Sequence, residues 1–320
     1  MKHLTVPPKS RHQTLLYSTL HTDVDTLEAD IAVVGMPFGA AYGPNAFGND
    51  QSRTPQALRE LTDRFVRAPD HYDFDIDGPL LQNRDDIRFV DCGDVMPNLA
   101  VPGEHYKKAE ALVRKLLGMG ALPIVLGGDH GITTPILRAY EALGKPITLI
   151  HVDAHLDWRD EVNGVTEGLS SPIRRASEMD HVGRIFQIGL RAQGSARTED
   201  LLAARRYGSE LVTAYELHEV GMKAVLDRIP DGGNYYITID ADGLDPSIMP
   251  AVDGPAPGGV SFIQARQLIH GLVNKGRVVG MDIVEIQPSK DSASKVTLVT
   301  AGRLIVNLIG ASIKAGYFDK

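Results

Sequence analysis

The sequence predicts an α/β fold in which a parallel β-sheet is covered by helices on both faces. Apolar runs of strand length alternate with amphipathic stretches of helical length, a pattern typical of a parallel sheet. The strand candidates are apolar almost throughout, as expected for strands that are buried on both faces. Three of these runs end in aspartate and histidine, and the carboxyl edge of such a sheet is where ligands bind.

The expected elements follow in order along the chain. The strand candidates are Ile31–Gly35, Ile87–Val90, Leu122–Val125, Ile147–Val152, Arg184–Gly189, Tyr235–Ile239 and Val278–Asp282. The helix candidates are Pro55–Phe65, Glu104–Leu117, Thr134–Leu143, Thr198–Tyr207, Gly221–Ile229, Phe262–Lys275 and Ser294–Ile313. Pro55 stands near the start of the first helix, where its missing N–H is harmless. A Gly- and Asn-rich loop, Gly39–Asp50, separates the first strand from this helix.

Composition and charge narrow the class of protein. The 320 residues are 43% hydrophobic and 23% charged, which is an ordinary globular composition. No linker-like stretch divides the chain, so we expect a single domain over residues 31–320, preceded by a surface segment over residues 1–30. The net charge of −8 at pH 7 gives no support for nucleic-acid binding.

The remaining compositional features concern the cellular compartment. A single cysteine, Cys92, excludes an intramolecular disulfide and favours a reducing, cytoplasmic location. The polar N-terminus, Met1–Ser10, has no apolar segment, so we expect no signal peptide. We also see no apolar run that approaches the length of a membrane span, and we expect no membrane partner.

Three short motifs carry residues that bind metal ions. His130 follows the strand at Leu122, and the motif Asp153-Ala-His-Leu-Asp157 follows the strand at Ile147. The motif Asp240-Ala-Asp242 follows the strand at Tyr235. In an extended chain, the i, i+2, i+4 spacing of Asp153, His155 and Asp157 points all three side chains to one side.

The six side chains together favour a binuclear site. Four carboxylates and two imidazoles in one place would have strongly shifted pKa values unless cations neutralised them. Oxygen ligands mixed with imidazole suit Mn²⁺, Ni²⁺, Co²⁺ or Zn²⁺, and six ligands are enough for two ions. The absence of cysteine ligands argues against a structural zinc site. Each motif alone has a simpler interpretation, such as a loop cap or the Asp245-Pro246 turn, but three at strand ends favour the metal site.

These motifs are similar to those of the ureohydrolase superfamily, which includes arginase and agmatinase. The resemblance covers most of the chain and rests on Gly35-Met-Pro-Phe38, Gly127-Gly-Asp-His130, Asp153–Asp157, Asp240–Pro250 and Glu285-Ile-Gln-Pro288. It implies an arginase-like, three-layer αβα domain around a parallel sheet of about eight strands. It also implies assembly as homotrimers or homohexamers, and hydrolysis of a guanidino group to urea and an amine.

The resemblance implies specific roles for the motif residues. His130, Asp153, Asp157 and Asp240 would bind one Mn²⁺, and His155, Asp153, Asp240 and Asp242 would bind the other, with a hydroxide bridging the pair. Glu285 would hold the substrate guanidinium, because a carboxylate engages this planar group through two charge-assisted hydrogen bonds. Asp157 and Glu285 are therefore candidate catalytic residues.

One loop departs from the family pattern. Where most members carry a His-Gly pair, this chain reads Val165-Thr-Glu-Gly-Leu-Ser-Ser-Pro172. One alignment puts Glu167 at the histidine position, and in another the loop has no equivalent. Glu167 is then a candidate catalytic and substrate-binding residue that relays protons or holds a second cationic nitrogen, or else a surface loop residue.

Other residues near the motifs receive smaller roles. Trp158 and Asn163 stand where arginase recognises an amino-acid head group, so both are candidate substrate-binding residues. We expect His151 to pack against its neighbours rather than bind metal, and Cys92, His105 and His270 to be structural or on the surface.

The function favoured by these observations is an agmatinase-like hydrolase of a small guanidino compound. Guanidine, guanidinobutyrate or a biguanide are the alternative substrates, and a cationic or amidine-bearing substrate end is favoured over a carboxylate. Single-zinc deacetylase chemistry is disfavoured by Asp157 and Asp242, which complete a second metal site. A metal-bound, non-catalytic subunit of a hetero-oligomer is the third hypothesis, supported by the missing histidine.

Overall fold

The central feature of the molecule is one parallel sheet. The computed structural model describes residues 5–6, 14–38, 42, 49–96 and 103–319. These residues form a nine-stranded sheet of order β1-β3-β2-β4-β9-β8-β5-β6-β7, with every strand pairing parallel. The strands are β1 (Thr19–Leu20), β2 (Ile31–Gly35), β3 (Phe89–Asp94), β4 (Leu122–Leu126), β5 (Ile147–Val152), β6 (Val182–Leu190), β7 (Glu210–Thr213), β8 (Asn234–Asp240) and β9 (Arg277–Val284). The predicted parallel sheet is confirmed, although the expected strand number of about eight is one too low.

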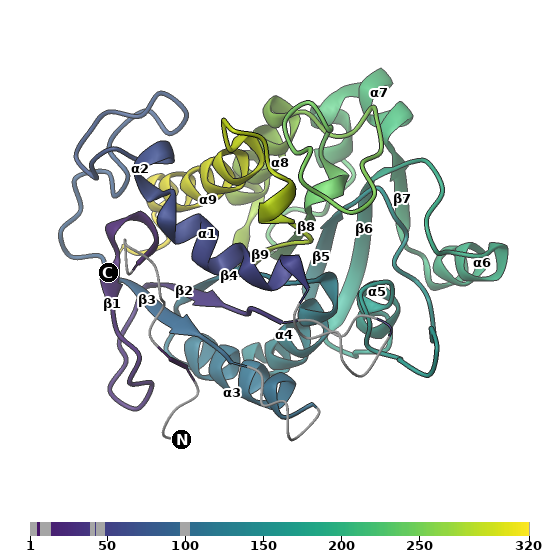
Figure 1. Ribbon diagram of the computed structural model, residues 1–320, viewed down its shortest axis with the longest axis horizontal. Coiled ribbons are helices and arrows are strands. Elements are labelled where there is room, and N and C mark those ends of the chain that lie inside the picture. Colours follow the sequence, from purple (N-terminus) through teal and green to yellow (C-terminus); the bar gives the residue numbers. More distant parts are fainter. Residues whose placement is uncertain (1–4, 7–13, 39–41, 43–48, 97–102, 320) are drawn as a thin grey trace.

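Helices cover both faces of the sheet, as Figure 1 shows. They are α1 (Thr54–Glu60), α2 (Thr62–Phe65), α3 (Glu104–Gly118), α4 (Thr133–Ala139), α5 (Pro172–Ala176), α6 (Thr198–Tyr207), α7 (Ala214–Leu226), α8 (Phe262–Lys275) and α9 (Val296–Lys314). Two separate hydrophobic clusters lie on the two faces. Leu268 of α8 and Leu304 of α9 belong to one cluster, and Leu112 of α3 and Ile136 of α4 belong to the other. The three-layer αβα architecture predicted from the sequence is therefore confirmed.

The N-terminal segment is more buried than the sequence indicated. Leu15 and Leu16 are fully buried, and the Leu15 backbone N–H donates to Asp91 Oδ2 at 2.9 Å. Strand β1 then pairs with the edge of β3, with Thr19 opposite Val90. The expectation of a purely surface segment over residues 1–30 is thus wrong for this stretch. A two-residue strand is too short to show the alternation by which strands are recognised.

Several elements differ from the sequence-based assignment, among them β1, helix α5, and the expected helix Pro55–Phe65, which is divided into α1 and α2. Strand β7 was not expected, and α7 begins at Ala214 rather than at Gly221. Thr213 caps α7 by accepting a hydrogen bond from the Glu216 N–H at its side-chain oxygen. Gly221, with φ of 77°, interrupts the helix, and this interruption accounts for an expected start at the glycine.

Helix α9 is the one described helix with the length and apolar composition of a membrane span. Its most apolar window has a mean hydropathy of 1.7, and 83% of that window is buried inside the protein. It packs against α8 and α1, and Gly302 lies so close to the Phe65 ring that a Cβ would meet it at 2.5 Å. The sequence expectation that no apolar run approaches span length overlooked α9, which serves here as a core helix.

Parts of the predicted organisation lie outside the described residues. Most of the Gly- and Asn-rich loop, residues 39–41 and 43–48, is among them, as is most of the N-terminus, residues 1–4 and 7–13. Cys92 is buried in β3, and burial raises the pKa of its thiol to about 12, consistent with a structural role.

Candidate metal centre

The sheet topology brings the predicted ligands together. Strands β4, β9, β8 and β5 are consecutive neighbours in the middle of the sheet. At their carboxyl ends stand His130, Glu285, Asp240 and Asp153, one side chain from each strand end. Because all four strands run in the same direction, these side chains meet at one edge of the sheet.

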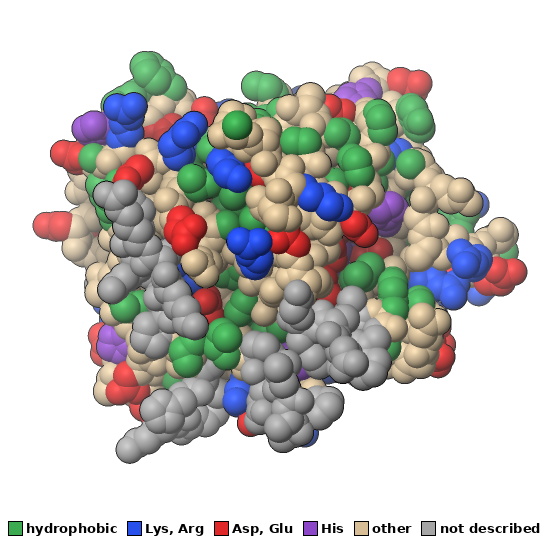
Figure 2. Space-filling model, viewed as in Figure 1, with side chains coloured by type: hydrophobic (Ala, Val, Ile, Leu, Met, Phe, Trp, Pro, Cys, Tyr) green, Lys and Arg blue, Asp and Glu red, His purple; other side chains and the backbone are tan. Residues whose placement is uncertain are grey.

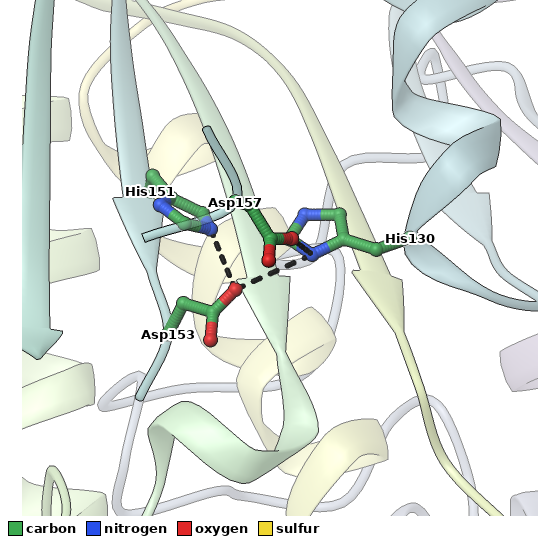
Figure 3. Close-up of side chains that lie close together, drawn as sticks. All are labelled: His130, His151, Asp153 and Asp157. Atoms are coloured by element: carbon green, nitrogen blue, oxygen red, sulfur yellow. Dashed lines mark hydrogen bonds and ion pairs between the residues drawn. The ribbon is translucent and has the colours of Figure 1, made fainter. Parts of the chain in front are cut away.

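One group of ligands surrounds the His130 imidazole. His130 Nδ1 lies 3.0 Å from Asp157 Oδ2, 3.2 Å from Asp240 Oδ2 and 3.4 Å from Asp153 Oδ2. Figure 3 shows the His130 ring and the Asp153 and Asp157 carboxylates pointing toward one another. Four buried side chains with one nitrogen and three oxygen donors are a ligand set that fits a divalent transition metal.

A second group lies next to the first. His155 Nδ1 lies 3.1 Å from Asp242 Oδ2 and 3.6 Å from Asp153 Oδ1. Asp153 therefore presents one carboxylate oxygen to each group, as a ligand shared by two ions would. The residues present thus fit a pair of ions, and Asp153 has the geometry of a bridge between them.

The pKa shifts in the cluster indicate a site that favours bound cations. Burial and the neighbouring Asp153 raise the pKa values of Asp157 and Asp242, and burial with Asp242 raises that of Asp240. Burial opposes protonation of His130, but hydrogen bonds that the ring N–H donates to the Asp153, Asp157 and Asp240 carboxylates outweigh it and raise the pKa of His130. A hydrogen bond to Asp242 raises the pKa of His155 to about 10. Metal ions bound here would lower these pKa values, so metal binding would release protons.

A buried network orients His130. Its Nε2 lies 3.0 Å from Thr238 Oγ1, and the Thr238 hydroxyl donates to Asp282 Oδ1 at 2.5 Å. Asp282 also accepts hydrogen bonds from Thr133 and from the Tyr236 hydroxyl. Such partners fix the orientation of a ligand ring, and here they leave Nδ1 facing the carboxylates.

His151 serves a similar supporting role. Its Nε2 lies 2.7 Å from Asp153 Oδ2, and its Nδ1 lies 3.1 Å from Gln187 Nε2. Gln187 donates to Nδ1, so Nε2 is left as the donor to Asp153. His151 lies within reach of an ion at the first group, but both of its ring nitrogens are engaged by protein atoms. This placement agrees with the expectation that His151 packs against its neighbours.

Backbone strain and close packing position several of these side chains. Asp157 and Glu285 adopt positive φ values of 48° and 63°, which are uncommon for residues with a side chain. Gly128 approaches Phe38 so closely that a Cβ would lie 1.9 Å from the Phe38 carbonyl oxygen. Gly194 lies beneath the His155 ring, where a Cβ would meet Cδ2 at 2.5 Å. Larger residues at either glycine would displace the edge of the site.

Glu285 lies beside the ligands with both carboxylate oxygens engaged. The His130 backbone N–H donates to Oε1 at 2.7 Å, and Gln51 Nε2 donates to Oε2 at 3.0 Å. Burial and the nearby Asp129 raise the pKa of Glu285 to about 8. A cationic ligand beside this carboxylate would lower its pKa and stabilise the charged form.

A cleft of about 270 Å³ opens above the ligands. Its described lining is Tyr42, Gln51, His155, Asp157, Leu169, Ser170, Gly194, Ser195, Asp240, Asp242, Asp253, Gly254 and Glu285. The Tyr42 and Ser170 hydroxyls form a hydrogen bond across the cleft. In Figure 2, acidic side chains lie near the middle of the face, with lysine and arginine side chains among them. No lysine or arginine stands among the described lining residues.

Comparison with known proteins now decides the family, because the Arginase family model matches residues 29–310. The chain belongs to the arginase family. It is 36% identical over 225 residues to a guanidinobutyrase of Pseudomonas aeruginosa, covering 69% of this chain and 70% of that protein. It is 30% identical over 284 residues to an agmatinase of Neisseria meningitidis, covering 85% and 84% of the two chains. The structure of proclavaminate amidino hydrolase from Streptomyces clavuligerus matches with a TM-score of 0.81, 25% identity, and coverage of 97% and 98%.

Family membership confirms the predicted superfamily, fold and enzyme class. The chain is an arginase-family amidinohydrolase, and its His and Asp cluster has the composition of a metal site. The ligand roles of the individual residues remain predictions that the geometry supports.

Glu167 is one of three predicted site residues that this arginase-family structure places outside the described cleft lining. Its carboxylate pairs with the Arg138 guanidinium on α4, with Arg138 Nη1 3.3 Å from Oε2. The same loop instead sends Leu169 and Ser170 into the cleft. The expected role of Glu167 at the histidine position therefore has no support in this geometry. A cation on α4 draws Glu167 away from the ligands, and the sequence offers no local sign of that partner.

Trp158 and Asn163 are also absent from the cleft lining. Trp158 is 1% exposed and packs against the Tyr207 ring, 5.7 Å between centroids. Asn163 is exposed in the turn that joins Val162 and Val165. Their assignment as substrate-binding residues has no support in the geometry.

Several residues of the arginase-family site escaped the sequence analysis. The sequence does contain a sign of the role of Asp282, because an acidic residue within a buried apolar strand needs hydrogen-bond partners. Arg191 follows strand β6 directly, is buried, and donates to the backbone oxygens of Asp242, Leu244 and Ala256. It thereby ties the segment that carries Asp242 to the sheet. Nothing in the sequence marks Gln51 and Asp253 as cleft residues, since isolated polar residues in loops are usually exposed.

Proposed function

We propose that this enzyme hydrolyses a C–N bond of a small guanidino compound and releases urea, with agmatine as the type of substrate. The observation that carries the proposal is a single cleft in which Glu285 stands beside two ligand groups that share Asp153. A guanidinium held by Glu285 would lie next to both groups. Proximity of this kind is what a bimolecular attack on a poor electrophile needs.

The proposed cofactor is a pair of divalent ions, with Mn²⁺ first and Ni²⁺ or Co²⁺ as alternatives. His130, Asp153, Asp157 and Asp240 would hold one ion, and His155, Asp153, Asp240 and Asp242 the other. When bound, the two ions lower the pKa of a shared water and supply hydroxide at neutral pH.

The side chains of the protein bind and orient the substrate, and they transfer protons during the reaction. Glu285 accepts two N–H groups of the guanidinium, and this contact holds the guanidinium carbon near the ligand groups. Water adds to that carbon, the bond to the amine breaks, and the leaving nitrogen takes up a proton. Asp157 lines the cleft and is the carboxylate placed to hold the proton between these two events.

The charge of the cleft supports a substrate whose far end is cationic or neutral. Asp253 lines the cleft with its side chain 79% exposed, and it accepts hydrogen bonds from Gln287 and Lys290 at 3.3 and 3.1 Å. A carboxylate-ended substrate would meet Asp253 without a lysine or arginine among the described lining residues. Repulsion between like charges disfavours such a substrate.

A second candidate function is a metal-bound, non-catalytic subunit of a hetero-oligomer. The observation in its favour is Leu169, an apolar side chain where this loop enters the cleft. The complete ligand set and Glu285 support the enzymatic function more strongly. A cytoplasmic location and a homotrimeric or homohexameric assembly belong to the same proposal.

The experiment is a urea assay on metal-loaded protein, with metal analysis of the same sample. The substrates are agmatine, 4-guanidinobutyrate, arginine, guanidine and a biguanide. We expect about two ions per chain and the highest kcat/KM with agmatine or the biguanide. Two bound ions without urea from any compound would favour the non-catalytic subunit, and a preference for guanidinobutyrate would contradict the proposed substrate class.

A further inference from the structure

The partner of Glu285 comes from a distant and unexpected part of the chain. Gln51 belongs to the short helix η2 (Asp50–Arg53), 234 residues from Glu285 in sequence. Gln51 is 6% exposed and Glu285 is 8% exposed, so their 3.0 Å hydrogen bond is shielded from water. A buried amide side chain needs a partner, and the carboxylate supplies it.

The two donors to Glu285 leave it suited to one type of ligand. The His130 backbone N–H occupies a position on Oε1, and the Gln51 amide occupies a position on Oε2. Each carboxylate oxygen has about two lone-pair sites, so each keeps about one for another donor. A guanidinium presents two parallel N–H groups that match these two free sites. Rotation of the carboxylate would break one of the existing hydrogen bonds.

The segment around Gln51 holds the same strand end at two further points. Thr54 Oγ1 donates to the Ile286 carbonyl oxygen at 2.9 Å, and the Ser289 N–H donates to Asp50 Oδ2 at 2.8 Å. Residues 50–54 thus contact residues 285–289 through three hydrogen bonds. Glu285 has a strained positive φ, which persists only where surrounding contacts hold it. The contacts from residues 50–54 supply part of that restraint.

We propose that Gln51 is a positioning residue that presets the Glu285 carboxylate for bidentate binding of the guanidinium. This inference rests on the proposed function, in which Glu285 is the group that contacts the substrate. Gln51 acts through Glu285 and not through the predicted metal ligands, because its one described side-chain hydrogen bond goes to Glu285. Loss of the amide lets the carboxylate rotate, so guanidinium binding weakens while the ligand groups stay in place.

The test is a double-mutant cycle of Gln51→Leu and Glu285→Gln, with Gln56→Leu as the matched control. Gln56 is an exposed glutamine on α1 whose amide bonds Glu60, so its substitution alters a glutamine near Gln51 without touching the cleft. Kinetics with agmatine give KM and kcat, calorimetry gives the affinity for guanidinium chloride, and metal analysis gives the ion content of each variant.

We expect Gln51→Leu to lower kcat/KM about 10- to 100-fold, mainly through KM, as supporting groups around a site commonly do. The affinity for guanidinium should fall in parallel, and the ion content should match wild type. In the Glu285→Gln background the second substitution should add less than about twofold, because two residues that act through one contact are not additive. Gln56→Leu should behave as wild type.

Three results would overturn the inference. They are a Gln51→Leu variant equal to wild type, a full additional loss in the Glu285→Gln background, or a loss of metal ions. A wild-type protein that binds guanidinium through Gln51 and Glu285 but releases no urea would sink the proposed function and leave the inference standing. A wild-type protein that does not bind guanidinium would overturn both.

Discussion

The floor and the rim of the cleft are built in different ways. The floor consists of the predicted ligand residues His130, Asp153, His155, Asp157, Asp240 and Asp242, which end a sheet strand or lie within five residues of its carboxyl end. The rim consists of the described cleft residues Tyr42, Leu169, Ser170, Ser195 and Asp253, all of which stand on loops. Floor residues inherit their positions from the sheet, whereas rim residues depend on loop paths that the sheet does not determine.

The comparison teaches which properties each region controls. The floor contains the nitrogen and oxygen atoms predicted to bind the metal ions, and its residues are those of the sequence motifs. We expect the rim to select the far end of the substrate, and here the loop contributes Leu169 and Ser170 where Glu167 was expected. Changes to the floor should therefore abolish catalysis, and changes to the rim should redistribute it among substrates.

The largest expected effect comes from the shared floor residue. Asp153→Asn should remove both ions together and lower activity by more than about 100-fold, because the carboxylate serves both ligand groups. Metal analysis and urea release measure the two effects, and chelation of wild-type protein should reproduce them. Asp253→Asn is the rim control that should retain both ions. Retention of one ion by Asp153→Asn would show that the carboxylate does not bridge.

The next effect concerns Glu285, which joins floor and rim. Glu285→Gln keeps the shape of the side chain but removes its charge, so transition-state binding should weaken by roughly 2–5 kcal/mol. The ion content should stay close to that of wild type, since Glu285 is not among the predicted ligands. Steady-state kinetics with agmatine and metal analysis test both statements, and unchanged kcat/KM would remove Glu285 from substrate binding.

The pH dependence of kcat/KM tests the ionisation of Glu285. The pKa of Glu285 is raised to about 8, mainly by burial, so the carboxyl is neutral at pH 6 and charged at pH 9. Only the charged form pairs with a guanidinium, so kcat/KM should rise as pH increases through about 8. Protons also compete with ions at His130 and His155 at low pH. A maximum of kcat/KM near pH 5 would contradict this assignment. Glu285→Gln should weaken the pH dependence of kcat/KM over the pH range in which the ion content of the protein does not change.

The smallest expected effect is a change in substrate preference, tested at two acidic residues. Asp253 lies on the rim, and Glu167 lies outside it. Asp253→Asn should lower the preference for agmatine over 4-guanidinobutyrate by a few-fold, as expected for an exposed charge worth about 0–1 kcal/mol. Glu167→Gln should leave that ratio unchanged, because Arg138 pairs with Glu167 outside the cleft. Specificity constants for both substrates measure the ratio. The opposite pattern would restore Glu167 to the site.

The sequence also determined most of the sheet and missed elements at its edges. The strands that carry ligands, β4, β5 and β8, are apolar runs that end in polar motifs, and both signals are local. The missed strand β7 and the two-residue β1 lie at the two edges, where strands are short and only partly buried. Such strands lack the apolar pattern on which recognition depends.

The sequence by itself determined the chemistry of the floor, because strand direction and strand ends follow from local patterns and parallel strands must place their carboxyl ends at one edge. Only the tertiary structure decided the partners of individual side chains. Gln51 reaches Glu285 across 234 residues of sequence, and Arg138 on α4 takes Glu167 out of the cleft. These pairings depend on loop paths and on the packing of helices against the sheet, and no spacing within the motifs records either one.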